Sequence, residues 1–268
     1  MSAVGAATLS VWRRYSPGET LVRWAAQLGL AALTAAMLWH VGVRWEYLAD
    51  APSQVGDLLV RMFPPEWGFA GALVRPLVQT INIATLGTAV AFVMALPIAF
   101  FAAINTSPAR ALYALARVVI VVSRSVDTLI WALVFIIVVG PGSLAGALAV
   151  AVRSIGFLAK LFAEAIEEID AGQVEAVTAT GAGRVQTLLY GIVPQVKPVV
   201  LGVSIYRWDI NIRESTVLGL VGAGGIGFTL NEAILGLEWA RVGLILTVVL
   251  GVVLVSEAIS ALARARMM

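Results

Sequence analysis

The stretch LVQTINIATLGTAVAFVMALPIAFFAAINTSPA, residues 77–109, is mainly apolar and contains no charged residue. Roughly 20 apolar residues in a helix cross the ~30 Å hydrocarbon core of a bilayer, so this stretch predicts a membrane span. The whole chain has the same character, because 60% of its 268 residues are hydrophobic and 13% are charged. A soluble domain carries about 25% charged residues. We therefore expect an all-α integral membrane protein and not a soluble enzyme.

Five further spans follow from the same criterion. Residues 128–152 are also uncharged, but Pro141-Gly142 indicates a tight turn that divides them between two spans. The expected spans are residues 21–43, 77–104, 112–139, 143–163, 196–221 and 240–262. A five-span alternative stays open, with residues 112–126 along the membrane surface, because the charges in and beside this stretch suit a lipid-facing helix poorly.

Arginine and lysine residues near the span ends predict the orientation, since cytoplasmic loops carry an excess of both. With the N-terminus inside, eight such residues face the cytoplasm and four face the other side: Arg13, Arg14, Arg23, Arg110, Arg184, Lys197, Arg264 and Arg266 against Arg44, Arg61, Arg75 and Arg241. Both termini are therefore expected in the cytoplasm. Residues 1–20 would form a cytoplasmic segment, residues 21–268 a single transmembrane domain, and residues 44–76 an extracytoplasmic loop.

The segment EAIEEIDAGQVEAVTATGAGRVQTLLYGIVPQ, residues 164–195, is the longest cytoplasmic connection of this topology and is too polar for lipid. Acidic residues at helical spacing predict that the fourth span extends into it. Short helices are expected at residues 173–180 and 184–190, with a glycine-containing break between them, because glycine favours the end of a helix. The chain is expected to turn back into the membrane at Gly191 and Pro194.

This loop resembles the coupling loop of the permease subunits of ABC importers. Their signature is a Glu-Ala-Ala triplet, a glycine three residues beyond it and, after nine more residues, an Ile-x-Leu-Pro ending. Glu175, Ala176, Gly181 and Pro194 stand at matching positions, whereas Val177 replaces the second alanine. The resemblance implies a short coupling helix, whose small residues let it seat closely in a cleft of a partner ATPase. The implied coupling residues are Glu175, Ala176, Thr180, Gly181 and Pro194.

The sequence lacks the residues of common catalytic and cofactor sites. It contains no cysteine and a single histidine, His40, which excludes thiolate sites and histidine clusters for a metal. Neither Lys160 nor Lys197 is followed by serine or threonine, so no P-loop is present, and ATP with Mg²⁺ is expected in a partner ATPase. The basic residues are spread along the chain and indicate no nucleic-acid surface. We expect no catalytic group, bound cofactor or metal in this chain.

The segment GAGGIG, residues 222–227, matches the letters of a dinucleotide-binding fingerprint. It follows a membrane span and not a strand, and no acidic residue stands at the required distance, so cofactor binding is not expected. An extended or re-entrant turn at the extracytoplasmic end of the fifth span fits better, packed in protein and not in lipid. The glycines expected to form this gate or structural turn are Gly222, Gly224, Gly225 and Gly227.

Charged residues within the spans are the other candidates for a site, because ionisable groups in a membrane usually face a cavity or a partner. Arg124 and Asp127 are three residues apart and Arg213 is four from Asp209, so each pair is within reach on one helix face. Two readings stay open: mutual neutralisation between helices, or arginines that line a route for an anion. The candidates for the route are Arg124, Asp127, Trp131, Arg207, Asp209, Arg213 and Glu214.

Three segments together look like the phosphonate importer permease of the PhnE type: SRSVDTLIWALVF (123–135), EAVTATGAGRVQTLLYGIVPQ (175–195) and RWDINIRESTVLGLVGAGGIG (207–227). This resemblance implies the type I ABC importer fold, about six spans with a coupling helix, in the inner membrane of a prokaryote. The implied partners are a second permease (the same chain or a paralogue), two ATPases, and an extracytoplasmic protein that delivers phosphonate, phosphate or phosphite. The alternatives are a permease for methionine or another oxyanion, and a secondary transporter.

Overall fold

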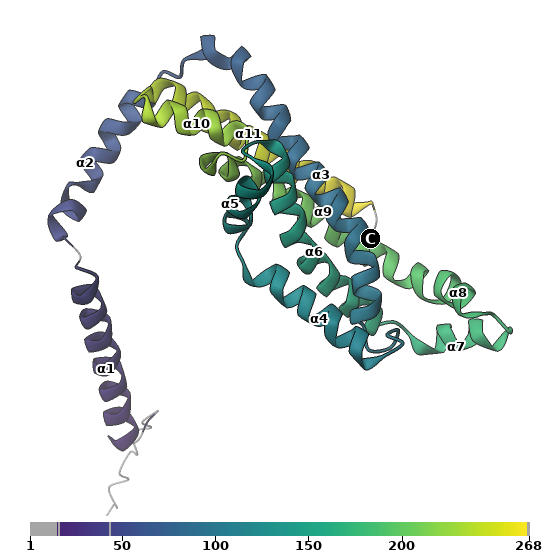
Figure 1. Ribbon diagram of the computed structural model, residues 1–268. Coiled ribbons are helices and arrows are strands. Elements are labelled where there is room, and N and C mark those ends of the chain that lie inside the picture. Colours follow the sequence, from purple (N-terminus) through teal and green to yellow (C-terminus); the bar gives the residue numbers. More distant parts are fainter. Residues whose placement is uncertain (1–14, 16, 43, 267–268) are drawn as a thin grey trace, which may run out of the picture. The chain divides into compact units, whose positions relative to one another are not determined.

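The computed structural model describes residues 15, 17–42 and 44–266. Residues 1–14, 16, 43 and 267–268 lie outside the described part, and with them Arg13, Arg14 and most of the expected N-terminal segment. The described residues form helices and turns and contain no strand, as expected for an all-α membrane protein (Figure 1). Contacts divide the chain into two compact units, residues 1–57 and 58–268.

The first unit holds α1 (Pro17–Val41) and most of α2 (Trp45–Met62). α1 covers the expected first span. α2 corrects the expectation of a loop at residues 44–76, because the chain is helical as far as Met62 although Pro52 lies inside the helix. Its apolar residues recur at the spacing of one helix face, which explains the helix. The residues on this face are Leu48, Val55, Leu59 and Met62.

The second unit contains the other helices. They are η1 (Trp67–Phe69), α3 (Ala70–Ala102), α4 (Arg110–Ser125), α5 (Thr128–Val139), α6 (Ser143–Glu167), α7 (Ala171–Ala179), α8 (Arg184–Thr187), the π-helix η2 (Leu188–Ile192), α9 (Val193–Leu218), η3 (Gly219–Val221), α10 (Ile226–Leu235) and α11 (Trp239–Ala265). Among all described residues, five helical stretches are long and apolar enough to cross a membrane, and α4 with α5 makes a sixth when counted as one bent span. The five are residues 18–41, 67–102, 143–167, 184–221 and 239–265.

The centre of the second unit is the contact between α3 and α6, whose C-terminal ends lie together (Figure 1). Small residues make this contact close. A Cβ added at Gly87 of α3 would lie 2.6 Å from Val150 Cγ1 of α6, so only glycine permits this approach. Small residues are common at helix interfaces in membranes, because close packing drives helix association there.

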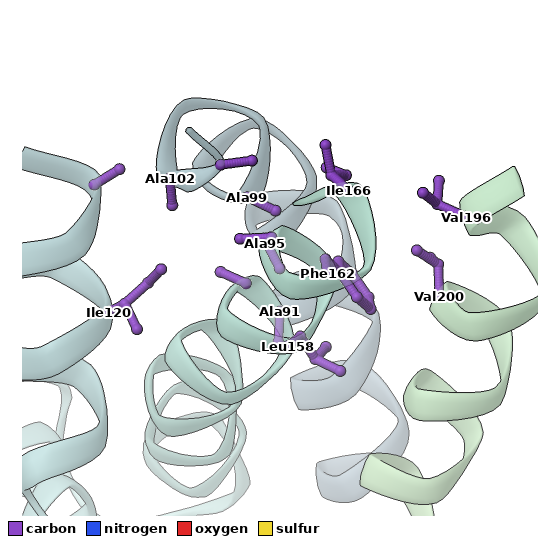
Figure 2. Close-up of a cluster of buried hydrophobic side chains, with 14 residues drawn as sticks. Ala91, Ala95, Ala99, Ala102, Ile120, Leu158, Phe162, Ile166, Val196 and Val200 are labelled. Atoms are coloured by element: carbon purple, nitrogen blue, oxygen red, sulfur yellow. The ribbon is translucent and has the colours of Figure 1, made fainter. Parts of the chain in front are cut away.

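A hydrophobic cluster near these C-terminal ends joins α3 and α6 to α4 and α9 (Figure 2). The rings of Phe92 and Phe162 meet edge to face with their centroids 6.0 Å apart. The first turns of α9 are therefore packed against α3 and α6 and are not loosely attached. The labelled residues of the cluster are Ala91, Ala95, Ala99 and Ala102 of α3, Ile120 of α4, Leu158, Phe162 and Ile166 of α6, and Val196 and Val200 of α9.

The third expected span, residues 112–139, is broken into α4 and α5, which differ in direction by 95°. Val126 is extended, and the carboxylate of Asp127 accepts a hydrogen bond from Leu129 N at 3.0 Å, so Asp127 caps a new helix. α4 has 16 residues and α5 has 12. Each is shorter than the roughly 20 residues of a full span. The structure thus replaces a straight span with a bent pair.

The turn expected at Gly191 and Pro194 is absent, because α8, η2 and α9 form one continuous helical stretch. In an α-helix, Pro194 would lack a hydrogen-bond donor and its ring would clash with the carbonyl four residues earlier. The helix widens here into a π-helix, in which Val193 N donates to Leu188 O. This wider turn accommodates the proline without a break, so the loop continues directly into the fifth expected span.

Candidate functional site

The segment between α6 and α9 forms α7 and α8, which project from one end of the helices around them (Figure 1). Asp170 caps α7 by accepting a hydrogen bond from Gly172 N at 2.8 Å. α7 ends at its C-cap Thr180, and Gly181 has a φ of +82°, which glycine adopts without strain. The short helix predicted at residues 173–180 is therefore present and begins two residues earlier.

A groove of about 560 Å³ lies between α7 and the following helix. Among the predicted coupling residues, Ala176, Thr180 and Gly181 line this groove. Glu175 is exposed on α7 outside the groove, and Pro194 is exposed in the first turn of α9. Large exposed apolar side chains beside a groove are typical of a protein contact. Such side chains here are Val185, Leu189 and Tyr190, which are 69%, 51% and 70% exposed.

The base of this projecting segment is held by polar contacts among α3, α4 and α6. Arg117 of α4 pairs with Glu167 of α6 at 2.9 Å, and its Nε donates to Ala102 O of α3 at 3.0 Å. Glu167 also accepts a hydrogen bond from Ile104 N at 3.0 Å. The end of α6 from which α7 departs is therefore fixed to its two neighbours.

A network of charged side chains joins α5, α6 and α9. Arg153 of α6 lies 3.3 Å from Asp127 (Nη1 to Oδ2) and 4.0 Å from Glu214 of α9 (Nε to Oε1). Glu214 also pairs with Arg207 at 3.3 Å and accepts a hydrogen bond from Thr128 Oγ1 at 2.6 Å. Two arginines and two carboxylates thus neutralise one another, which is what charges in an apolar environment require.

Arg207 is almost fully buried, with 4% of its side chain exposed. Its Nε donates to Ser154 Oγ at 2.9 Å, and its guanidinium carbon lies 5.1 Å from the centre of the Phe157 ring. Asn211 Nδ2 donates to Ser154 Oγ at 3.0 Å and to Thr88 Oγ1 of α3 at 2.8 Å. The charged network therefore continues through neutral polar groups to α3, and its buried donors have partners.

A second charged pair lies on α9 and contacts α11. Arg213 pairs with Asp209 at 2.9 Å, as the four-residue spacing predicts. The side chain of Asp209 is 6% exposed and accepts a hydrogen bond from Ser256 Oγ of α11 at 2.7 Å. Arg213 remains 45% exposed. The candidates Asp209 and Arg213 therefore belong to a separate site from Arg207 and Glu214.

The structure does not pair Arg124 with Asp127, although their spacing on a continuous helix would allow it. The chain bends between them, and Asp127 pairs with Arg153 instead. Arg124, in the last turn of α4, is exposed and makes no ion pair with any described residue. Trp131 stacks on Phe135 with ring centroids 6.1 Å apart, and its buried Nε1 donor has no partner in the described part of the chain.

Residues 222–225 form a tight turn after η3 that leads into Ile226 and Gly227, the first residues of α10, and packs against α3. A Cβ at Gly225 would lie 2.6 Å from Thr80 Oγ1, and the same oxygen accepts a hydrogen bond from Ile226 N at 2.8 Å. Gly227 contacts Thr216 O so closely that no side chain would fit. The turn also needs positive φ angles, which favour glycine. These angles are those of Gly222 (+89°), Gly224 (+81°) and Gly225 (+79°).

Six polar members of these networks were not among the candidates from sequence: Thr88, Thr128, Arg153, Ser154, Asn211 and Ser256. Arg153 carried a signal, because it is a charge near the middle of an expected span. The threonines, the serines and the asparagine carried none, since small polar residues are ordinary in membrane helices. Within the described ranges, no three histidine, aspartate or glutamate side chains are grouped to bind a metal ion.

Comparisons with known proteins place this geometry in context. The model of a family described as "Binding-protein-dependent transport system inner membrane component" matches residues 95–267. The phosphite transport system permease protein PtxC of Stutzerimonas stutzeri is 40% identical over 247 residues, which cover 90% of each chain. The phosphate-import permease protein PhnE of Mycolicibacterium smegmatis is 43% identical over 230 residues, which cover 84% of this chain and 43% of that longer protein.

Two further similarities concern a shorter relative and a solved structure. A cryptic phosphonate transport system permease protein of Escherichia coli is 48% identical over 94 residues, 35% of this chain and 77% of that protein. A chain of the MetNI methionine ABC transporter, solved in inward-facing conformations, superposes with a TM-score of 0.65 at 22% identity. That match covers 73% of this chain and 96% of the other. It shows that the two chains share the fold of an ABC importer permease.

Proposed function

Because the chain belongs to the family of binding-protein-dependent transport system inner membrane components and is a transmembrane permease subunit of an ABC importer, we propose that it carries phosphonate, phosphate or phosphite. The relatives support this cargo class, since their names refer to phosphite, phosphate and phosphonate. All three compounds are small phosphorus oxyanions, and arginine suits them because its planar guanidinium donates two parallel hydrogen bonds to such groups.

The observation that carries the cargo proposal is the division of the membrane arginines into two kinds. Arg207 and Arg153 are neutralised by carboxylates and hold helices together. Arg124 makes no ion pair in the described part of the chain, and Arg213, although paired with Asp209, keeps 45% of its side chain exposed. We assign the attraction of the anion to these two arginines and place the unpartnered indole N–H of Trp131 beside the route as a further donor.

The remaining candidates have a supporting role in this proposal. Asp127, Asp209 and Glu214 hold neighbouring arginines in position and prevent the route from becoming so positive that it retains the anion. The glycine-rich segment at residues 222–227 packs closely against α3. This packing supports its assignment as a gate or structural turn, against which other helices move during transport.

Transport requires partners in this proposal. They are a second permease (the same chain or a paralogue), two ATPases that hold ATP and Mg²⁺, and an extracytoplasmic protein that delivers the anion. The groove beside α7 and the exposed apolar residues next to it support α7 as the helix that meets the ATPase. ATP-driven closure of the ATPases then biases the permease between outward- and inward-facing states. Both termini and α7 lie in the cytoplasm in this arrangement.

Competition for uptake tests the cargo. Proteoliposomes contain the permease, its ATPase and its binding protein, and take up radiolabelled phosphite in the presence of ATP. We expect excess methylphosphonate, phosphate or unlabelled phosphite to reduce the uptake and methionine to leave it unchanged. Failure of every phosphorus oxyanion to compete would refute the cargo. Uptake driven by an ion gradient without ATP would refute the ATP-driven mechanism and favour a secondary transporter.

A further inference from the structure

The side chain of Gln195 connects the projecting helix α7 to the first turn of α9. Its Oε1 accepts a hydrogen bond from Asp170 N at 2.9 Å, and its Nε2 donates to Gly191 O at 2.7 Å and lies 3.4 Å from Asp170 O. Asp170 is itself the residue whose carboxylate caps α7 at Gly172. A single side chain therefore links the N-terminal cap of α7 to the π-helix and to α9.

This contact bypasses the covalent path between the two helices. Along the chain, α7 reaches α9 only through the segment 180–183, in which Gly181 has a positive φ and Gly183 is extended. Glycine is the least restricted residue, so this path transmits displacement poorly. At its other end, α7 joins α6, which Glu167 and Arg117 fix to α4 and α3 and which packs against α9 in the cluster of Figure 2. Gln195 adds to these paths a direct hydrogen-bonded link between the N-terminal cap of α7 and α9.

The surroundings of Gln195 suit this role. Gly191 of the π-helix is buried against α7, where a Cβ would lie 3.5 Å from Val174 Cα, so the two helices touch next to the hydrogen bonds. Val196 and Val200, which follow Gln195 on α9, belong to the cluster of Figure 2. Farther along the same helix lie Arg207 and Glu214. α9 thus runs as one helix, with Pro198 inside it, from Gln195 to the charged network.

We propose that Gln195 is a positioning residue, which fastens α7 to α9 so that displacement of α7 moves the helix that carries the charged network. The proposal deepens the function given above and rests on it, because the displacement is assigned to the partner ATPase. Gln195 touches neither cargo nor nucleotide in this role. Without the hydrogen bonds of Gln195, α7 moves about its end at Gly181 and displaces α9 less. Less cargo is then transported per ATP hydrolysed.

The first experiment measures cargo transported per ATP hydrolysed in proteoliposomes of the assembled importer. The variants are Gln195→Ala and Gln195→Met, the second of which keeps the length of the side chain but not its hydrogen bonds. We expect this ratio to fall about tenfold in both, the effect of losing two hydrogen bonds of ordinary strength. ATP hydrolysis per assembled complex stays within about twofold, because neither variant alters the ATPase. Gln54→Ala, at an exposed glutamine of α2, is the matched control and keeps the ratio of the wild type.

A ratio that is unchanged in both Gln195 variants would overturn the proposal. A role in folding alone would reduce the amount of assembled complex, and with it transport and hydrolysis in equal proportion, which also leaves the ratio unchanged and overturns the proposal. A wild-type complex without ATP-driven uptake would refute the proposed function instead, so the two failures are distinguishable.

The second experiment tests, without the ATPase, whether the hydrogen bonds of Gln195 hold α7 against α9. The chain has no cysteine, so Thr178→Cys on α7 and Val199→Cys on α9, both exposed positions, accept spin labels in the full-length protein without further changes. Pulsed electron resonance reports the distribution of distances between the labels. We expect a single narrow distribution in the parent and a broad one after Gln195→Ala, and the parent distribution after Gln54→Ala. Equal widths in the parent and the Gln195 variant would overturn the proposal.

Discussion

Arg207 shows how a membrane helix holds a charge without exposing it to lipid. Its guanidinium has a carboxylate, a hydroxyl and an aromatic ring as neighbours. Glu214 lies two turns along the same helix, whereas Ser154 and Phe157 come from α6 and are brought close by the fold. A buried ion pair contributes little net stability, but removing one partner leaves a charge without compensation. The network therefore specifies how α6 and α9 pack, and its loss should be felt mainly as instability.

Glu214→Gln tests whether loss of the carboxylate beside Arg207 destabilises the protein. The substitution keeps the size of the side chain but leaves Arg207 and Arg153 with one carboxylate between them, so we expect a loss of about 3 kcal/mol in stability. Thermal unfolding of the purified protein in detergent measures it. The double variant Arg207→Met/Glu214→Gln should be more stable than Glu214→Gln alone, since the excess charge is gone. Glu46→Gln, at an exposed position of α2, is the control, and an equal loss there would contradict the interpretation.

Arg124 should behave in the opposite way, because it makes no ion pair with any residue that the structure describes. Arg124→Gln is expected to leave thermal stability unchanged and to weaken transport, with a KM raised roughly tenfold to hundredfold, the effect of losing one hydrogen bond to a charged oxyanion. Arg110→Gln, at the other end of the same helix, is the matched control. Unchanged kinetics in Arg124→Gln would show that Arg124 does not contact the anion.

At the scale of elements, the sequence predicts long apolar helices well and the joints between them poorly. Span length and the scarcity of charge locate α3, α6 and α11, because the thickness of the bilayer sets the length and its apolar interior disfavours charge. Helical spacing also predicts the pair of Asp209 and Arg213, which lie on one helix. The pair of Asp127 and Arg153 could not be predicted this way, because it depends on the bend before α5 and on the packing of α6 beside it.

The connections between helices differ from the sequence-based predictions for a common reason. Proline and glycine permit several local conformations, and tertiary contacts select one of them. Pro194 was expected to end a helix, but the π-helix before it keeps the helix continuous, with Gly191 packed on Val174 and held by Gln195. In the coupling segment the sequence signature did locate α7 and its glycine end, since Gly181 needs a left-handed backbone that few other residues tolerate.

Two glycines in this segment allow a matched test of the coupling element. Gly181 has a φ of +82°, whereas Gly183 has a φ of −70°, and neither has close neighbours that would exclude a side chain. Gly181→Leu therefore strains the backbone by about 1–2 kcal/mol and tilts the end of α7, while Gly183→Leu does not. We expect Gly181→Leu to abolish uptake with normal membrane insertion, as judged by uptake assays and immunoblots of membranes. Normal uptake in this variant would contradict the assignment of α7 as the coupling helix.

At the scale of the second unit, a closely packed group of helices meets one helix that connects several sites. The close packing of α3 on α6, the glycine turn on Thr80 and the contact of Arg117 with Glu167 form a fixed core. α9 crosses this core and is the one described helix that links the projecting α7, the charged network and the contact with α11. Movement of α9 relative to the core would therefore change the coupling surface and the membrane charges together, as alternating access requires.

Orientation in the membrane is the prediction at this largest scale. The excess of arginine and lysine at one set of span ends predicts that the segment with α7 lies in the cytoplasm and that the turn between α10 and α11 lies on the other side. Because the chain has no cysteine, Thr178→Cys in α7 and Leu237→Cys in that turn are each the sole reactive thiol, and both positions are exposed. In intact cells, a membrane-impermeant maleimide should label Leu237→Cys and not Thr178→Cys, and permeabilised cells should label both. Labelling of Thr178→Cys alone in intact cells would show the opposite orientation. It would also contradict the assignment of α7 as the helix that contacts a cytoplasmic ATPase.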